Sequence, residues 1–364
     1  MILSSLSNTN ENVLGDIVND VQSAFIKGRQ ILDGPFIINE VIQWCKSKKK
    51  QSLIFKVNFE KAFDTVRWDF LDDVLKKFGF GNKWCEWIQK CLKSSRGSIL
   101  VNGSPTEEFQ FFKGLKQGDP LSPFLFILVM ECLHLSFQNV VDAGMFTGIS
   151  LNHSVKLSHM FYADDAVFVG QWNDQNINTL SRVLECFYHA SGLRINMSKS
   201  KIMGVQVDRD KVQQAAGKLG CLILNTPFSY LGSRKASWVK WKYVLADKVH
   251  GGLGVSSLFA LNRGLMIKWL WKFYNQKNSL WSNVIKAIQG KDGNIGLTRK
   301  AGVRSCWTSI VKETKELQKQ GVNVFDYLGL KLGNGVLHFL STIGCVGDAN
   351  DFIPVVCPRK TSRR

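Results

Sequence analysis

HMFYADDAVFVG, residues 159–170, sets two adjacent aspartates between two runs of apolar, β-prone residues. This pattern predicts two short strands joined by a turn that carries Asp164 and Asp165. Adjacent carboxylates repel one another, and a divalent cation relieves that repulsion; among such cations Mg²⁺ suits carboxylate ligands well. The alternative is a solvated β-turn, in which aspartate is common without any metal.

The flanking segments predict an α+β unit that ends near Gly204. Residues 51–59 alternate and are rich in β formers, which predicts a strand, and residues 63–80 carry apolar side chains at helical spacing. Asn102 and Gly103, between β-prone flanks, predict a hairpin over 98–112. Further elements are expected as helices over about 123–141 and 176–191 and as a short strand over 193–197.

Composition favours a polyanionic partner. The 364 residues carry a formal net charge of +18 and are 45% hydrophobic, so the chain can bury a core beneath a strongly basic surface. Nucleic acid is the first candidate partner. A basic surface with no dedicated ligand is the alternative that charge alone leaves open.

Cysteine spacing and hydropathy point to a soluble, intracellular protein. The nine cysteines form no C-x-x-C pair and no cluster with zinc-ligand spacing, so we expect reduced thiols. The N-terminus lacks the pattern of a secretory signal. The richest apolar run, residues 124–130, is bounded by Pro123 and Glu131 and is too short to cross a bilayer, so no membrane is expected as a partner.

Several motifs, taken in order, resemble those of reverse transcriptases, and in particular those of plant LINE-type, non-LTR retrotransposons. YADD resembles motif C of that family, and the order matters because accidental matches are not ordered. The other matching segments are QSAFIKGRQILD (22–33, fingers), KVNFEKAFDTVRW (56–68, motif A), GLKQGDPLSPFLF (114–126, motif B), SGLRINMSKSKI (191–202, motif D), FSYLG (228–232, motif E) and GGLGVSSLFALNRGLMIKWLWKF (251–273, after the thumb).

The resemblance implies an α+β fold, the palm and fingers of a right-hand polymerase, with an antiparallel sheet packed on helices and a mostly helical C-terminal region. The expected divisions are partial fingers (1–50), palm (51–232), a Trp- and Lys-rich post-thumb segment (233–290) and a weakly patterned C-terminal region (291–364). It also implies RNA-directed DNA polymerase activity, with an RNA template, a DNA primer and deoxynucleoside triphosphates as partners. A nuclear location is expected from the family, and no protein partner can be inferred.

The family uses two Mg²⁺ ions, for which Mn²⁺ can substitute, to activate the primer 3′-hydroxyl and to neutralise the leaving pyrophosphate. By resemblance, the ions would be held by Asp164, Asp165 and the first position of the motif A run. Lys199, with Lys201 close behind, would protonate the pyrophosphate. The implied substrate-binding residues are Phe63 (excluding a ribose 2′-hydroxyl), Arg29 and Lys27 (facing the triphosphate or the template), Tyr162, and Gly114, Gln117 and Gly118 (a wall of the pocket).

Simpler structural roles stay open for most of these residues. An aromatic residue such as Phe63 at a helix start is often part of a core, and the sequence Gln-Gly-Asp-Pro is by itself a turn. The lysines near position 200 are also compatible with a solvated face.

At the motif A position where the family has aspartate, this chain has Asn58. Asparagine offers one neutral carbonyl oxygen and lacks the charge that bridges two cations, so cation affinity should fall and the rate should drop on the order of a thousandfold or more. Asp64 is a conceivable substitute, but it lies six residues further on, past a strand-to-helix turn.

Other departures from the family concern the thumb and the N-terminus. Only a short segment separates Gly232 from the GGLG motif, so we expect the thumb to be largely deleted, and part of the fingers to be missing at the N-terminus. Lys116 stands where arginine is frequent, which keeps the charge but not a bidentate fork. These features predict a decayed or truncated copy; a non-catalytic remnant that still binds nucleic acid is the alternative function.

Overall fold

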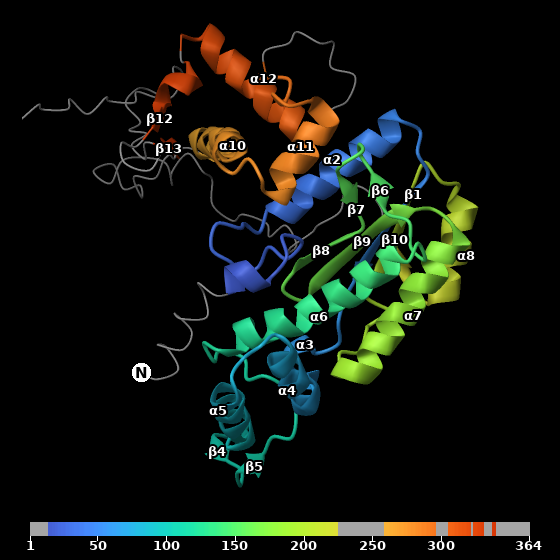
Figure 1. Ribbon diagram of the computed structural model, residues 1–364, viewed down its shortest axis with the longest axis vertical. Helices are drawn as coiled ribbons and strands as arrows, with labels where there is room; N and C mark the ends of the chain where they lie inside the picture. Colours follow the sequence, from blue (N-terminus) through green and yellow to red (C-terminus); the bar gives the residue numbers. More distant parts are fainter. Residues whose placement is uncertain (1–13, 225–257, 296–304, 322, 331–336, 340–364) are drawn as a thin grey trace, which may run out of the picture. The chain divides into compact units, whose positions relative to one another are not determined.

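A computed structural model of the chain describes residues 14–224, 258–295, 305–321, 323–330 and 337–339 (Figure 1). The chain divides into two compact units, Met1–Phe228 and Ser229–Arg364, so the first unit includes the segment expected as fingers (1–50) and all but the last four residues of the expected palm (51–232). Motif E, the thumb region and the boundary expected near Gly232 lie outside the described residues.

The first unit is built on a five-stranded sheet in the order β11-β10-β1-β9-β8. All neighbours pair antiparallel except β10 and β11. The central strand β1 is buried over most of its length, which explains its almost continuous run of apolar residues. The strands are β1 (Ser52–Val57), β8 (His159–Tyr162), β9 (Asp165–Gln171), β10 (Lys201–Val205) and β11 (Leu222–Ile223).

Helices cover both faces of this sheet. Leu53, Phe55 and Val57 of β1 share one hydrophobic core with helices α6, α7 and α8, whereas Ile54, which points to the other face, is also buried. On that other face α2 packs against β8 and β10 (Figure 1). These helices are α2 (Asp33–Ser47), α6 (Ser122–Asp142), α7 (Asp174–Ser191) and α8 (Arg209–Leu219). The predicted α+β class is confirmed.

Helix α6 is the longest helix of this unit and is apolar on most sides. By length and composition alone it could cross a membrane, and it extends well beyond the apolar run at 124–130. Phe126, Ile127 and Val129 are each 0% exposed inside the core of the first unit. Burial on several sides therefore accounts for its composition.

Between motifs A and B the structure departs from one prediction and agrees with another. The single helix expected over 63–80 is wrong: α3 (Ala62–Thr65) and α4 (Trp68–Lys77) are separated by Val66 and Arg67, which are extended, with ψ of 125° and 131°. The hairpin at Asn102 and Gly103 is confirmed, since both residues have positive φ, 51° and 84°. The remaining elements of this region are α5 (Asn82–Lys93), the pair β2 (Arg96–Gly97) and β5 (Phe109–Gln110), and the pair β3 (Leu100–Val101) and β4 (Ser104–Pro105).

The strand expected over 193–197 is also wrong. That segment forms only an isolated bridge between Phe59 and Ile195, and the strand that pairs with β1 begins at Lys201. The reason is local: the side chain of Asn196 accepts the backbone N–H of Lys199, and its carbonyl accepts the N–H of Ser200. These bonds fold residues 196–200 into a turn. Farther back in the chain, β6 (Ile149–Ser150) and β7 (Lys156–Leu157) form a small hairpin.

In the second unit, helices surround an aromatic cluster. The ring centroids of Trp269 and Trp281 lie 4.8 Å apart, as do those of Phe273 and Trp307. Trp307 Nε1 donates to the carbonyl of Gly293 at 2.7 Å, so the indole is both buried and satisfied. Several of its tryptophans therefore form a core. The elements are α10 (Leu258–Asn275), α11 (Leu280–Gln289), α12 (Cys306–Lys319), a 3₁₀ turn (Val324–Tyr327), β12 (Leu328–Leu330) and β13 (Leu337–Phe339).

Candidate active site

The two adjacent aspartates lie at the hairpin between β8 and β9, which we call the aspartate turn (Tyr162–Asp165). Tyr162 pairs with Asp165, so Ala163 and Asp164 form a two-residue turn. Ala163 has φ 51° and is the one described residue of this turn with positive φ, as at the first central position of a type II′ turn. Asp164 is exposed, whereas Asp165 begins β9 and is half-buried.

The electrostatic surroundings of the two acids differ. Asp165 forms an ion pair with Lys56 of β1, with 2.9 Å between Oδ1 and Nζ. The protein around Asp164 raises the pKa of its carboxyl by desolvation, and the charge of Asp165 adds to this shift while Lys56 opposes it. A cation near Asp164 would favour the ionised form of this carboxyl and so oppose that shift.

Asn58 directly follows β1 and comes close to the aspartate turn in the sheet. Val57 pairs with Ala166, so Asn58 is one residue beyond that pair and Asp165 is one residue before it on the antiparallel neighbour. Because side chains alternate along a strand, Asn58, Lys56 and Asp165 belong to the face opposite α6 and α7. The backbone of Asn58 is held on its other side: its N–H donates to Ser200 Oγ at 3.1 Å, and its carbonyl accepts the N–H of Asn196 at 2.7 Å.

The donor set at this place does not fit two divalent cations. It offers the carboxylates of Asp164 and Asp165 and one neutral amide, and the Lys56 ammonium already lies against Asp165. Among the described residues, no group of three or more histidine, cysteine, aspartate or glutamate side chains could hold a metal ion. Two cations a few ångströms apart need more negative charge than this arrangement provides.

Motif B is fixed to motif A through its backbone. Leu115 N–H donates to the carbonyl of Phe63 at 2.7 Å, and Gly114 N–H donates to the carbonyl of Val66 at 2.7 Å. Gly114 has φ +88°, and a Cβ at this position would lie 2.5 Å from the carbonyl oxygen of Asp64. Only glycine fits such an approach without a shift of the backbone.

The residues predicted to form the substrate wall occupy distinct places. The ring of Phe63 stacks on Phe126 of α6, with 4.4 Å between centroids, so part of it belongs to the core. Gly114 and Gln117 line a cavity of about 250 Å³ beside α5, which Asp64 also lines. Gly118 has φ +87°, and a Cβ at this position would meet nothing within 4 Å. Tyr162 is half-buried against the core, and Lys27 and Lys199 are exposed.

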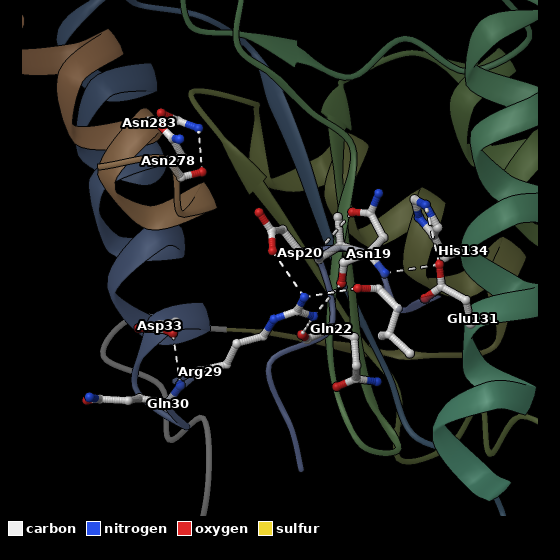
Figure 2. Close-up of polar contacts among 12 residues, drawn as sticks. Asn19, Asp20, Gln22, Arg29, Gln30, Asp33, Glu131, His134, Asn278 and Asn283 are labelled. Carbon is white, nitrogen blue, oxygen red and sulfur yellow. Dashed lines mark hydrogen bonds and ion pairs between the residues drawn. The ribbon is translucent and has the colours of Figure 1, made fainter. Parts of the chain in front are cut away.

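Arg29 is engaged within its own segment (Figure 2). Its Nη1 donates to the carbonyls of Asn19 and Gln22, both at 2.7 Å, and its Nη2 donates to the carbonyl of Val18 at 2.9 Å. It also pairs with Asp20 at 3.1 Å. This geometry differs from the prediction that Arg29 faces a triphosphate or the template, because the guanidinium is already committed to three backbone oxygens.

Gln22 is a residue of this region whose role the sequence did not reveal. Its side chain is buried, and Oε1 accepts the N–H groups of Ala163 and Ala24, both at 3.0 Å. A second group that was missed is a buried polar cluster, in which His134 Nδ1 lies 2.7 Å from His159 Nε2 and His134 Nε2 lies 3.9 Å from Glu131. Contacts over such sequence distances leave no periodic signal. Gln22 lies in the segment that resembles the fingers motif (22–33), but the resemblance does not indicate its contact with Ala163.

Comparison with known proteins establishes the family. Residues 2–234, more than half of the chain, match the reverse transcriptase (RNA-dependent DNA polymerase) family. The chain belongs to the reverse transcriptase family. The predicted reverse transcriptase family is thereby confirmed, whereas the plant origin stays a prediction. The chain is similar to proteins of non-LTR retrotransposons. One relative is the Pol polyprotein of the type-2 retrotransposable element R2DM of Drosophila melanogaster, 26% identical over 61% of this chain.

Other relatives cover a similar range. A protein of transposon TX1 of Xenopus laevis is 28% identical over 55% of this chain. The matched part spans 15% of the frog protein and 20% of the fly protein, so this chain corresponds to a small part of either. Among solved structures, telomerase of Candida albicans in complex with a fragment of telomeric RNA aligns with a TM-score of 0.45 and 11% identity, over 89% of this chain and 47% of that one.

Proposed function

We propose that this chain is the polymerase module of a non-LTR retrotransposon reverse transcriptase whose cation site is impaired by Asn58. The observation that carries the proposal is the pairing of Val57 with Ala166, because it brings position 58 next to the aspartate turn in the sheet. Family membership supports the reaction class, which is nucleotide addition to a primer 3′-hydroxyl on an RNA template.

Loss of one carboxylate should weaken cation binding more than folding. Asn58 keeps the size of aspartate, and the bonds that fix its position in the sheet come from its backbone. The missing charge removes the group that would bridge two cations, and about 4 kcal/mol of lost transition-state stabilisation corresponds to roughly a thousandfold in rate. We therefore expect a folded chain with weak cation affinity and little synthesis.

The test restores the acid. Asn58→Asp should tighten Mn²⁺ binding, measured by electron paramagnetic resonance, by about tenfold or more, because an anionic oxygen joins Asp164. Asn173→Asp is the matched control: it adds the same charge at the N-cap of α7, where aspartate caps as well as asparagine, and should leave Mn²⁺ affinity unchanged. Equal effects of both variants would refute the site.

Primer extension on an RNA template tests whether Asn58 impairs nucleotide addition. We expect faint Mg²⁺-dependent synthesis at most from the unaltered chain, more from Asn58→Asp, and none when Asp164→Asn is added. Robust synthesis by the unaltered chain would show that position 58 is not the missing acid, and Asp64 would become the leading replacement.

Loss of the thumb remains a prediction, as does a nuclear location.

A second candidate function is nucleic-acid binding without catalysis, favoured by the net charge of +18. Such binding should show little sequence preference and should weaken steeply with salt, because each phosphate contact releases counterions. A flat salt dependence, measured by fluorescence anisotropy with labelled single-stranded RNA and DNA, would remove nucleic acid as the partner. Binding without any extension by Asn58→Asp would favour this candidate over the first.

A further inference from the structure

We propose that Gln22 is a positioning residue for the aspartate turn: its side-chain oxygen holds the backbone N–H of Ala163 and so sets the direction in which Asp164 and Asp165 leave the hairpin. The inference deepens the proposed function and rests on it to the extent that these two acids bind the cation. It concerns a residue of the fingers motif that makes its contact through a buried amide.

The aspartate turn needs an external hold because its backbone is strained. Ala163 has φ 51°, a region that costs a non-glycine residue on the order of 1 kcal/mol or more, and glycine is the usual residue at the first position of a type II′ turn. A strained residue persists only when the surrounding structure fixes it. The hydrogen bond from Ala163 N–H to Gln22 Oε1, 3.0 Å long, is such a restraint.

The Gln22 side chain is suited to this role by burial and by geometry. It is 1% exposed, and its one carbonyl oxygen uses both lone pairs, on Ala163 and on Ala24. Its Nε2 has no hydrogen-bond partner among the residues that the structure describes. A buried amide that leaves its donor unsatisfied is costly, so its retention calls for a compensating role.

The backbone around Gln22 is tied to β8, the strand that leads into the turn. Phe161 N–H donates to the carbonyl of Val21 at 2.7 Å, and Ser23 N–H donates to the carbonyl of Phe161 at 2.9 Å. Gln22 and Phe161 form a parallel bridge at the sheet edge. The backbone of Gln22 is therefore fixed beside Phe161, which lies two residues before Ala163 in the chain.

Arg29 and Glu131 contact the same segment from opposite sides (Figure 2). The Arg29 guanidinium binds the carbonyl of Gln22 itself, as well as those of Val18 and Asn19. Glu131 of α6 accepts the N–H of Asn19 at 3.2 Å. Residues 18–22 thus link helix α6 to the aspartate turn. Gln22, in the fingers motif, makes this link through a buried side chain and does not need to contact a substrate.

The first experiment measures the restraint without a metal. Gln22→Met keeps the length of the side chain and removes the acceptor, so hydrogen exchange at the Ala163 amide, measured by NMR, should accelerate at least tenfold. Ser23→Ala is the matched control, since it removes a neighbouring buried bond, Oγ to the Phe161 carbonyl at 3.2 Å, and should leave the Ala163 amide protected. If Gln22→Met does not fold, Gln22→Asn, one methylene shorter, takes its place. Unchanged protection at Ala163 in the folded variant would overturn the proposal.

The second experiment measures the consequence for the acids, in the Asn58→Asp background. Gln22→Met should weaken Mn²⁺ binding about tenfold. Ala163→Gly removes the strain that Gln22 restrains, so adding it to Gln22→Met should recover at least half of the loss on a logarithmic scale, which a general loss of packing would not allow. No recovery, or an equal loss in Ser23→Ala, would overturn the positioning role. If Asn58→Asp itself binds no Mn²⁺, the proposed function has failed, and exchange at Ala163 still decides the role of Gln22.

Discussion

Gly114 N–H donates to the carbonyl of Val66 at 2.7 Å, and the carbonyl of Gly114 accepts Trp68 Nε1 at the same distance, so motif B is bound to the break between α3 and α4. The carbonyl of Val66 therefore accepts a hydrogen bond from outside the helix, and the N–H of Arg67 donates to the carbonyl of Ser191 at 2.9 Å. The interruption of the helix is thus a junction of three segments distant in sequence.

This junction makes Gly114→Ala the most damaging of the motif B glycine changes. The new Cβ would lie 2.5 Å from the carbonyl oxygen of Asp64, at a φ of +88° that disfavours alanine. We expect a loss of about 2 to 4 kcal/mol in the free energy of unfolding, from strain plus overpacking. Chemical denaturation measures it.

Gly118→Ala is the matched control for that prediction. Its φ of +87° is nearly the same, but a Cβ there would meet nothing within 4 Å. Its loss should be about 1 to 2 kcal/mol, from backbone strain alone. Equal losses at the two glycines would contradict the close approach of motif B to Asp64.

Local patterns predicted the elements whose causes are local. The hairpin at Asn102 and Gly103 and the hairpin that carries the aspartates follow from turn chemistry and alternation, and both are present. One failure lies where a distant partner takes a backbone group: the carbonyl of Val66 accepts the N–H of Gly114, and the helix is interrupted there. The other failure has a local cause that alternation does not reveal, because the hydrogen bonds of Asn196 to Lys199 and Ser200 form a turn at the end of the 193–197 segment.

The site divides in the same way. Asp164 and Asp165 could be predicted from two adjacent charges between runs of apolar residues. The family resemblance identified Asn58 as the residue at the motif A aspartate position. The family resemblance assigned Arg29 to the triphosphate or the template, yet backbone carbonyls of residues 18–22 engage it. Gln22 carries no charge and repeats with no period, so only the fold reveals its bond to Ala163.

Phe63→Leu should distinguish the contribution of the Phe63 ring to stability from its predicted role in excluding the 2′-hydroxyl of a ribonucleotide. Loss of the stack on Phe126 should cost about 1 to 2 kcal/mol of stability. In the Asn58→Asp background it should also raise the use of ribonucleotides relative to deoxynucleotides, because the barrier to a 2′-hydroxyl shrinks. Phe70→Leu, which removes an edge contact to Phe187, should lower stability without changing that ratio. A ratio unchanged by Phe63→Leu would leave Phe63 a core residue only.

Lys56→Met should strengthen cation binding in the Asn58→Asp background. The Lys56 ammonium lies 2.9 Å from Asp165 Oδ1 and competes for that carboxylate. Its removal should tighten Mn²⁺ binding by at least threefold and lower stability by about 1 to 3 kcal/mol, since a half-buried carboxylate loses its partner. Lys201→Met removes the same charge from the β10 residue that pairs with Lys56, and serves as the control. Weaker Mn²⁺ binding in Lys56→Met would mean that the lysine supports the site.

Glu131, which is 3% exposed on α6, should make the stability of the chain depend on pH. Burial raises the pKa of its carboxyl from 4.5 to about 7, although the Asn19 N–H and the charge of Arg29 act in the opposite direction. The folded state therefore binds more protons than the unfolded state between these two values, so this group makes stability fall as pH rises from about 4.5 through 7. The full effect is about 3 kcal/mol.

The buried histidines oppose this trend, so a difference measurement is needed. Burial, with the charge of His134, lowers the pKa of His159 to about 3, which makes stability rise with pH between about 3 and 6.5. Glu131→Gln keeps an oxygen for the Asn19 N–H and removes the titrating proton while His159 stays in place. Relative to this variant, the unaltered chain should lose about 3 kcal/mol of unfolding free energy between pH 4.5 and pH 8, measured by urea denaturation across that range. If the difference in unfolding free energy between the two proteins stays constant with pH, Glu131 titrates at its ordinary pKa. The Glu131 carboxyl that accepts the Asn19 N–H would then be ionised over most of that pH range.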